Sequence, residues 1–315
     1  MRAASIATFN DSAETSLVRR SFDDETLHFL IALREIIAAA GSRFEPYLRC
    51  ALVGTLRDVA SVKVGWPYQR PALERKAPHR SVPKRFRERI QWLVDDVASL
   101  PLGVDARIII GDSRASGSWR DALCDTKAQV CLSSPPYLNN YDYADATRLE
   151  LYFLGTVRTW AGLCSKIRAN MVAASTQQST LERAEAGWTL LTSLPNTARA
   201  ARQLSTSLTK QRRDRPRGKE YDQMLPAYLA DISQVLSRAH THLDAGGILA
   251  WVVGDSAPYG VYVDTPALIS RMAEETGFTP LQTIPLRQRG SRWAQNGTRH
   301  QLALSEHLIV LRRPS

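Results

Sequence analysis

Apolar residues in the first hundred positions recur every three or four residues, which is the period of an amphipathic helix. A first helix is predicted to begin at the Ser-x-x-Asp capping pattern of Ser21 and Asp24 and to stop at Gly41. A second begins near Pro46 and keeps its apolar stripe to Val59. The stripe of a third consists of Phe86, Ile90, Leu93 and Val97. Residues 1–100 are therefore expected to form a helical region, interrupted by a proline-broken basic linker.

Short apolar runs bounded by turn residues appear after residue 100 and are typical of strands in a buried sheet. The runs predicted as strands are Arg107 to Ile110, Val130 to Leu132, Ile248 to Val253, Leu281 to Leu286 and His307 to Leu311. Helical patterns separate most of them. This alternation predicts an α/β fold with core parts at 101–162 and 221–315, the second of which ends in a strand hairpin. Residues 163–220 contain no convincing strand and are expected to be an inserted helical region with a basic loop.

The apolar run at 130–132 leads directly into Ser134-Pro135-Pro136-Tyr137, which has the groups needed to hold a planar amino group. The Ser134 hydroxyl and the Pro135 carbonyl are hydrogen-bond acceptors, and consecutive prolines remove two backbone donors that would compete for them. The Tyr137 ring is a surface on which a base can stack. These four residues are the predicted catalytic residues, and a rigid loop without chemistry is the alternative.

The chain carries 41 Lys and Arg against 31 Asp and Glu, which gives a formal net charge of +10. This excess favours a polyanionic partner such as DNA, although a merely solvated surface would give the same total. The cations gather at the end of the insertion and between the last two strands. The residues predicted to contact DNA are Lys210, Arg212, Arg213, Arg215, Arg217, Arg287, Arg289 and Arg292. For the insertion, an exposed surface loop is the alternative.

Several other classes of site find no support in the sequence. The four cysteines are Cys50, Cys124, Cys131 and Cys164. They form no Cys-x-x-Cys pair and have no closely spaced histidine, so we predict reduced thiols and no metal site. Neither a Walker loop nor a three-glycine dinucleotide fingerprint is present. No stretch approaches the ~18 uninterrupted apolar residues of a membrane span, so a cytoplasmic location is expected.

Four segments carry a resemblance to a known family. They are Ile108 to Arg114, Ser133 to Tyr141, Gly246 to Ser256 and Glu306 to Arg313. In these segments and their order the chain resembles the amino-group DNA methyltransferases, which make N4-methylcytosine or N6-methyladenine from S-adenosylmethionine. The resemblance implies a Rossmann-like class I methyltransferase sheet and a target base flipped out of double-stranded DNA. It also implies that Asp112 and Ser113 lie near the cofactor. A serine at position 134 favours cytosine N4 in this family, and adenine N6 stays open.

One expected feature of that family is missing from the sequence. Its members usually bind S-adenosylmethionine with an Asp-Pro-Phe-x-Gly-x-Gly-like strand and loop, where glycine lets the cofactor approach the backbone. No such loop is found here, and in relatives with this motif order the missing pieces would precede residue 1. The sheet is therefore expected to be incomplete, and the chain to act in a heterodimer, as the second half of a split methyltransferase whose partner carries the glycine loop.

Two other functions stay open at this point. The chain could be a non-catalytic DNA-binding or specificity subunit that keeps a methyltransferase-like scaffold without its cofactor half. A catalytic chain could instead act on RNA bases or glutamine amides, which also present planar NH₂ groups. Ser134 stands where the glutamine-modifying relatives usually have asparagine, and this disfavours the amide substrate.

Overall fold

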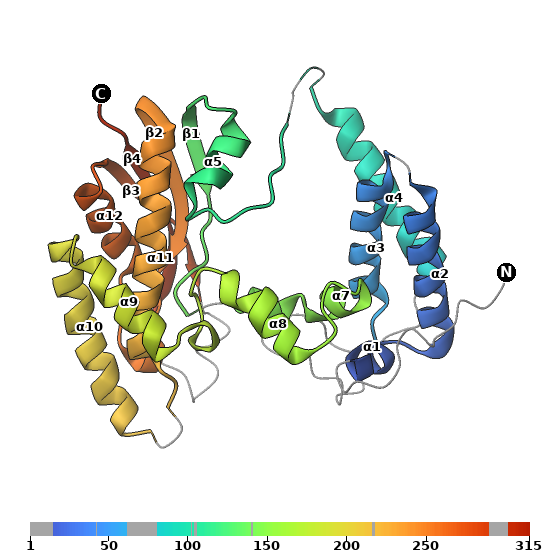
Figure 1. Cartoon of the computed structure of the whole chain (residues 1–315), viewed down its shortest axis with the longest axis horizontal. Helices are drawn as coiled ribbons and strands as arrows, with labels where there is room; N and C mark the ends of the chain where they lie inside the picture. The colour runs from blue at the N-terminus through green and yellow to red at the C-terminus, as the bar shows by residue number, and fades with distance from the viewer. Residues whose placement is uncertain are drawn as a thin grey trace. The chain divides into compact units, whose positions relative to one another are not determined.

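The computed structural model describes residues 15–41, 43–61, 81–101, 103, 106–139, 141–215, 218–289 and 302–315. These residues form a mixed α/β structure with one four-stranded sheet and many helices (Figure 1). The chain divides into two compact units. A helical unit takes residues 1–105 and 143–169, and a sheet unit takes 106–142 and 170–315. The units cut across the four regions expected from the sequence, because the segment that follows the Ser-Pro-Pro-Tyr loop belongs with the N-terminal helices.

The helical unit contains the three long helices that the periodicity predicts. Its helices are α1 (Thr15–Ser21), α2 (Asp24–Ala40), α3 (Glu45–Val59), α4 (Val82–Ser99), α6 (Tyr143–Ala146), α7 (Arg148–Phe153) and α8 (Trp160–Lys166). Gly41 ends α2 in the left-handed conformation, as predicted. The predicted start was wrong by two residues, because Asp23 accepts the backbone N–H of Thr26 at 2.7 Å and is the cap. The expected linker reaches into α4, and residues 62–80 of it lie outside the described residues.

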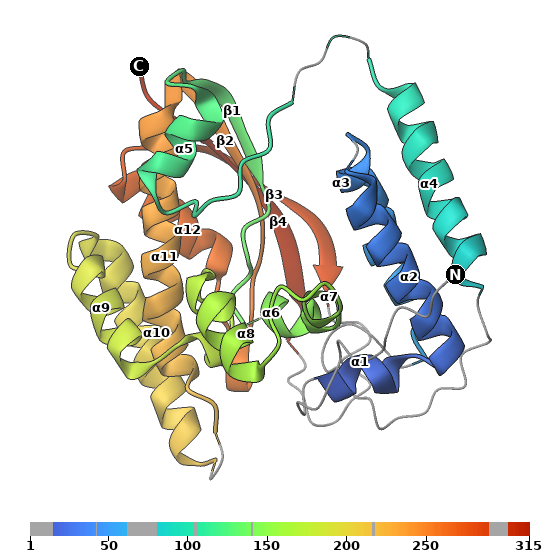
Figure 2. The ribbon, with the colours of Figure 1, turned by 45° about the vertical axis from the view of Figure 1, so that its right-hand side comes forward.

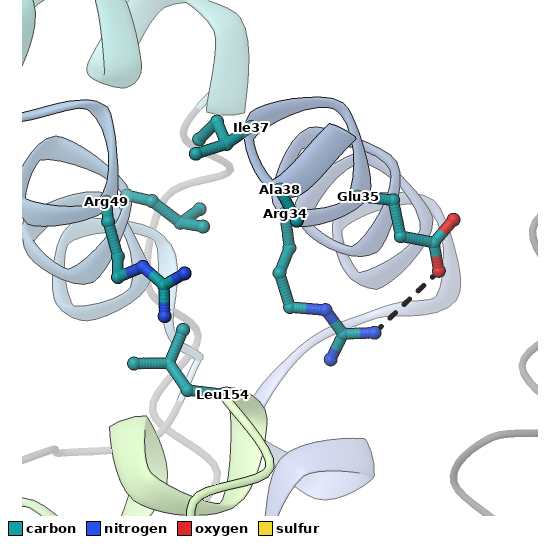
Figure 3. A pocket seen from close by; sticks show the side chains of 7 residues that line it. Arg34, Glu35, Ile37, Ala38, Arg49 and Leu154 are labelled. Atoms are coloured by element: carbon teal, nitrogen blue, oxygen red, sulfur yellow. Dashed lines mark ion pairs between the residues drawn. The ribbon is translucent and has the colours of Figure 1, made fainter. Parts of the chain in front are cut away.

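Polar contacts join the elements of this unit. The Arg34 guanidinium on α2 donates to the Phe153 carbonyl at 2.7 Å, and Arg89 on α4 binds both carboxylate oxygens of Asp58 at 2.9 Å. A pocket of about 220 Å³ lies between α2, α3 and Leu154, with the side chains of Arg34 and Arg49 at its sides (Figure 3). None of the predicted site residues lines it.

The sheet contains four of the five predicted strands. They are β1 (Ala128–Ser133), β2 (Leu243–Gly254), β3 (Thr279–Arg289) and β4 (Leu304–Arg312), in the spatial order β1-β2-β4-β3. β1 is parallel to β2, whereas β4 is antiparallel to both of its neighbours. The fifth prediction was wrong: Arg107 to Ile110 is not a strand, and Ile108 and Ile110 are 91% and fully exposed. A strand needs a neighbour for its ladder, and no described strand lies beside this segment.

The core lies on one face of the sheet, beneath α11 (Tyr221–His242) and α12 (Thr265–Glu275) (Figure 1). Alternate residues of β2, namely Leu249, Trp251 and Val253, point into this core. The helices of the insertion, α9 (Leu181–Leu191) and α10 (Pro195–Arg213), pack on α11, so the insertion adds an outer layer. It contains no strand among its described residues, as predicted. The remaining helix, α5 (Ser116–Leu123), precedes β1.

Candidate active site

The Ser-Pro-Pro-Tyr loop begins where β1 ends, at the carboxyl edge of a parallel strand pair. Ligands of open α/β folds bind at this edge. Ser134 is exposed, Pro136 and Tyr137 are half-buried, and Leu138 is buried in the core with 1% of its surface exposed. The loop is therefore anchored by Leu138 and by Pro135, which is also buried, and its first residue is open to a ligand.

The hydrogen bonds of Ser134 leave its acceptor capacity available. Its hydroxyl donates to the Val252 carbonyl on β2 at 3.2 Å, and its oxygen lies 3.4 Å from the Tyr137 hydroxyl. A serine hydroxyl has one proton and two lone pairs. With the proton directed to Val252, a bond from the Tyr137 hydroxyl would use one lone pair of Oγ, and the other lone pair can accept a hydrogen bond from an incoming amino group.

An arginine that the sequence suggested for DNA contact lies against Tyr137. The guanidinium carbon of Arg289, at the end of β3, is 5.1 Å from the centroid of the Tyr137 ring. Arg289 also donates to the Asp255 carbonyl at 3.1 Å and lies 3.7 Å from the Glu306 carboxylate. This cation–π contact fixes the plane of the ring and covers part of one face. A stacked base would therefore use the other face.

Asp255 ties the ends of β2 and β4 together. Its carboxylate accepts the Ser305 backbone N–H at 2.8 Å and the Tyr262 hydroxyl at 3.1 Å. Burial, together with the charge of Asp255, raises the pKa of Tyr262 to about 12. Asp255 is thus a structural residue at a strand-end turn and is no part of a phosphate loop.

Gly254 provides the space in which Tyr137 and Arg289 meet. A Cβ atom at this position would overlap an Arg289 guanidinium nitrogen and would lie 2.9 Å from a Tyr137 ring carbon. We expect Gly254→Ala to lower the free energy of unfolding by about 1–3 kcal/mol, because overpacking forces the neighbouring side chains to move. Urea unfolding measures this loss.

Gly117 on α5 is the matched control, because a Cβ there would meet nothing within 4 Å. Gly117→Ala is expected to be neutral or to stabilise the helix by up to ~1 kcal/mol. Equal effects of the two substitutions would show that the packing at Gly254 does not constrain Tyr137 and Arg289.

Glu306 neutralises the two arginines beside the loop. Its carboxylate accepts two hydrogen bonds from Arg287, at 2.5 and 3.0 Å. The hydrogen bond from Arg287 lowers the pKa of Glu306 below its ordinary value of 4.5. The carboxylate therefore stabilises the folded state above pH 4.5, and this contribution disappears as the pH falls through the lower pKa of the folded protein.

We therefore expect Glu306→Gln to weaken the dependence of stability on pH below 4.5. Thermal unfolding between pH 7 and pH 3 measures it, with Glu274→Gln on the exposed surface of α12 as the control. An unchanged pH profile in Glu306→Gln would mean that the ion pair contributes nothing measurable to folding.

The two residues predicted near a cofactor belong to a separate network. Asp112 accepts four hydrogen bonds from Arg114, three from its guanidinium and one from its backbone N–H at 2.9 Å, and these lower the pKa of Asp112. Ser113 accepts the indole N–H of Trp119 through its carbonyl at 2.8 Å. Arg114 also binds Asp231 of α11 at 2.9 Å. Their role at a cofactor stays a prediction.

The predicted DNA-binding cations of the insertion lie at the same edge as the loop. Tyr259, which comes soon after β2, shows their position. The guanidinium carbon of Arg215 lies 4.5 Å from the centroid of the Tyr259 ring. The Tyr259 hydroxyl also bonds the backbone of Lys219. Lys210, Arg213 and Arg215 are exposed, whereas Arg212 pairs with Asp222. Arg217 and Arg292 lie outside the described residues.

The edge thus gathers the loop, the ends of β2 and β3, and basic residues from two segments. Val252, Gly254 and Glu306 had not been predicted as part of the site. A glycine at the end of an apolar strand was the available signal for Gly254, but its contact with Tyr137 depends on the pairing of distant strands. In the described part of the chain, no group of His, Cys, Asp and Glu could hold a metal ion, and no helix is long and apolar enough for a membrane crossing.

No protein-family model matches the chain, and no curated protein matches it. A solved structure from Thermus thermophilus, provisionally described as a DNA modification methylase, resembles part of it. The matched part is 25% identical and covers 28% of this chain and 38% of that protein, with a TM-score of 0.23. A likeness of this extent assigns neither the fold nor the activity of the whole chain.

Proposed function

We propose that this chain is a subunit of a DNA methyltransferase that holds an exocyclic amino group for methylation by S-adenosylmethionine, with cytosine N4 as the preferred target. The observation that carries this proposal is the exposed Ser134, whose bonds to Val252 and Tyr137 leave one lone pair of Oγ for a ligand. A loop with only a structural role would have no need of an acceptor directed outward beside an aromatic ring.

The reaction that we propose uses this chain to position and polarise the base. The amino nitrogen of cytosine is a weak nucleophile because its lone pair is delocalised into the ring. Hydrogen bonds from its N–H groups to Ser134 Oγ and the Pro135 carbonyl draw electron density back onto nitrogen, and they stabilise the positive charge that grows during attack. The ring face of Tyr137 opposite Arg289 stacks the base, so that the nitrogen is oriented for in-line transfer.

DNA is the substrate that the charge around the edge supports. Lys210, Arg213 and Arg215 are exposed beside the end of β2, where phosphates of a bound duplex could meet them. Arg287 and Arg289 are paired with Glu306, so we assign to Arg289 a role in holding Tyr137, and to Arg287 only a secondary contact with DNA.

The described residues do not include a complete binding site for S-adenosylmethionine. The cofactor needs a glycine loop after a parallel strand, and β1 and β2 are followed by Ser134 and by Asp255, whose side chain closes a turn. When bound, S-adenosylmethionine supplies the electrophilic methyl group. We propose that another polypeptide binds it.

Co-expression of this chain with the product of the neighbouring gene tests the function. Methyl transfer to DNA is measured with labelled S-adenosylmethionine, and the nucleosides are then identified by mass spectrometry. We expect N4-methylcytosine in DNA from the two chains together and none with either chain alone. DNA binding without methylation by any combination would favour a specificity subunit.

A further inference from the structure

One edge of the sheet is open and is built like the interior of a larger sheet. β1 is the terminal strand, and its centre, Val130-Cys131-Leu132, is apolar on both faces. Val130 and Leu132 are 61% and 75% exposed. Continuous apolar runs of this kind are typical of parallel strands that are buried between neighbours and under helices on both faces.

The opposite edge has the features of a natural edge strand. β3 contains Pro280 and Pro285, and its ladder is interrupted beside each of them. Proline and bulges are the usual means by which an edge strand is kept from pairing further. β1 has no proline and no charged residue between Ala128 and Ser133, so only this edge is suited to an additional strand.

The outer face of the sheet beside β1 is also apolar. In the ladder, Val130 and Leu132 share a face with Ile248 and Ala250, and the pairing continues to Val310 on β4. These β2 and β4 residues are only half-buried, while α11 and α12 cover the other face. Within the described part of the sheet unit, no helix covers this outer face.

The handedness of chain connections shows on which side a further strand fits. α5 lies on the same face as α11, because Trp119 of α5 stacks on His242 with ring centroids 5.8 Å apart. A right-handed crossover through α5 into β1 places residues 106–110 on the side of β1 away from β2. Ile108, Ile109 and Ile110 of this segment are apolar, whereas the Arg107 side chain bonds to Asp121 and Cys124. The backbone of residues 106–110 belongs to no strand, and the segment leads into α5 (Figure 2).

We propose that the edge of β1 and the outer face at Val130 and Leu132 bind a strand–glycine loop–helix segment of another polypeptide. Its strand pairs in parallel with β1, between β1 and residues 106–110, and its helix covers the outer face. A right-handed crossover that leads from the partner strand away from β1 would place the partner helix on the outer face, opposite α5 and α11, so the switch point of the completed sheet lies between the two strands, beside Ser134. The expectation that the partner segment carries a glycine loop rests on the proposed function.

A second copy of this chain fits the surface less well. Two copies related by a two-fold axis would pair β1 with β1 in an antiparallel direction, and neither copy would give residues 106–110 a neighbour. The described part of the N-terminal segment contains helices and no strand. Helices could cover the outer face of the sheet, but they could not pair with β1.

Site-specific photocrosslinking in the cells that naturally make this protein tests the proposal. A photoreactive phenylalanine replaces Val130, Leu132 or Ile108, and mass spectrometry identifies each linked peptide. Leu281 and Leu286 on β3 are matched control positions, because they are also exposed apolar residues of a terminal strand. We expect the first three positions to link to one segment of one other protein, with an apolar run, a glycine turn and a helix. The β3 positions should give no product above background.

A substitution that introduces a charge into the same surface provides a second test. Leu132→Lys should reduce the crosslink from Ile108 strongly, because the ammonium group would be buried by the docked segment. Links to the chain's own helices, to a second copy, or to no protein would overturn the proposed surface, as would an unreduced crosslink in Leu132→Lys. A linked partner whose complex fails to methylate DNA would instead overturn the proposed function and leave the surface intact.

Discussion

Replacing Ser134 with alanine is expected to lower methyl transfer by the two-chain enzyme about 100- to 1000-fold, the loss typical when one preorganised polar group of an active site is removed. The substitution removes the acceptor and also the hydrogen bond to Val252. DNA affinity should be unchanged, because the cations assigned to phosphate contact lie in other segments. Single-turnover kinetics at saturating S-adenosylmethionine measure the chemical step, and fluorescence anisotropy measures DNA binding.

Ser133→Ala is the matched control for this experiment. Ser133 is the last residue of β1 and has an exposed side chain like its neighbour, but it comes before the loop. This control should keep nearly full activity. Wild-type turnover in Ser134→Ala would remove the chemistry assigned to the loop, and equal losses in both variants would point to disturbed folding of the strand end.

The second large effect is expected at Asp231, which holds several parts of the sheet unit together. This α11 carboxylate is 6% exposed, and it binds Arg114 at 2.9 Å, Arg183 at 2.7 Å and the Ala173 backbone N–H at 2.8 Å. Asp231→Ala leaves two partly buried guanidinium groups without their shared anion. Breaking a buried pair in this way costs about 3–5 kcal/mol of unfolding free energy. Urea unfolding followed by far-ultraviolet circular dichroism measures this loss.

Asp121→Ala provides the control, because this aspartate lies on the exposed surface of α5 in the same unit. It should change the unfolding free energy by less than about 0.5 kcal/mol. A similarly small loss in Asp231→Ala would show that the network adds little to stability. Asp231→Asn should be intermediate, because the amide keeps one acceptor and loses the charge.

The long helices were predictable because their signal is local. The stripe from Leu48 to Val59 and the stop at Gly41 lie within the helices they define, and the structure contains both. The cap of α2 was misplaced because Ser21 belongs to α1 and Asp23 lies closer to the first turn. Choosing between two nearby polar residues requires the backbone angles, which the sequence does not show.

Features that depend on distant neighbours were harder to predict. The composition of Arg107 to Ile110 is that of a buried strand, yet a ladder partner must come from elsewhere and is missing from the described chain. The contact between Arg289 and Tyr137 is of the same kind, because it joins positions about 150 residues apart through the register of β2, β4 and β3. The sequence identified both as notable residues but could not show that they meet.

The two prolines of β3 also have a consequence for the size of the assembly. If both edges were receptive, one chain could bind a partner strand at each edge, and two partners could bind one chain. Because Pro280 and Pro285 interrupt the ladder of β3, we expect the proposed partner to add only at β1. The stoichiometry should therefore be one to one, and excess partner should leave the mass of the complex unchanged.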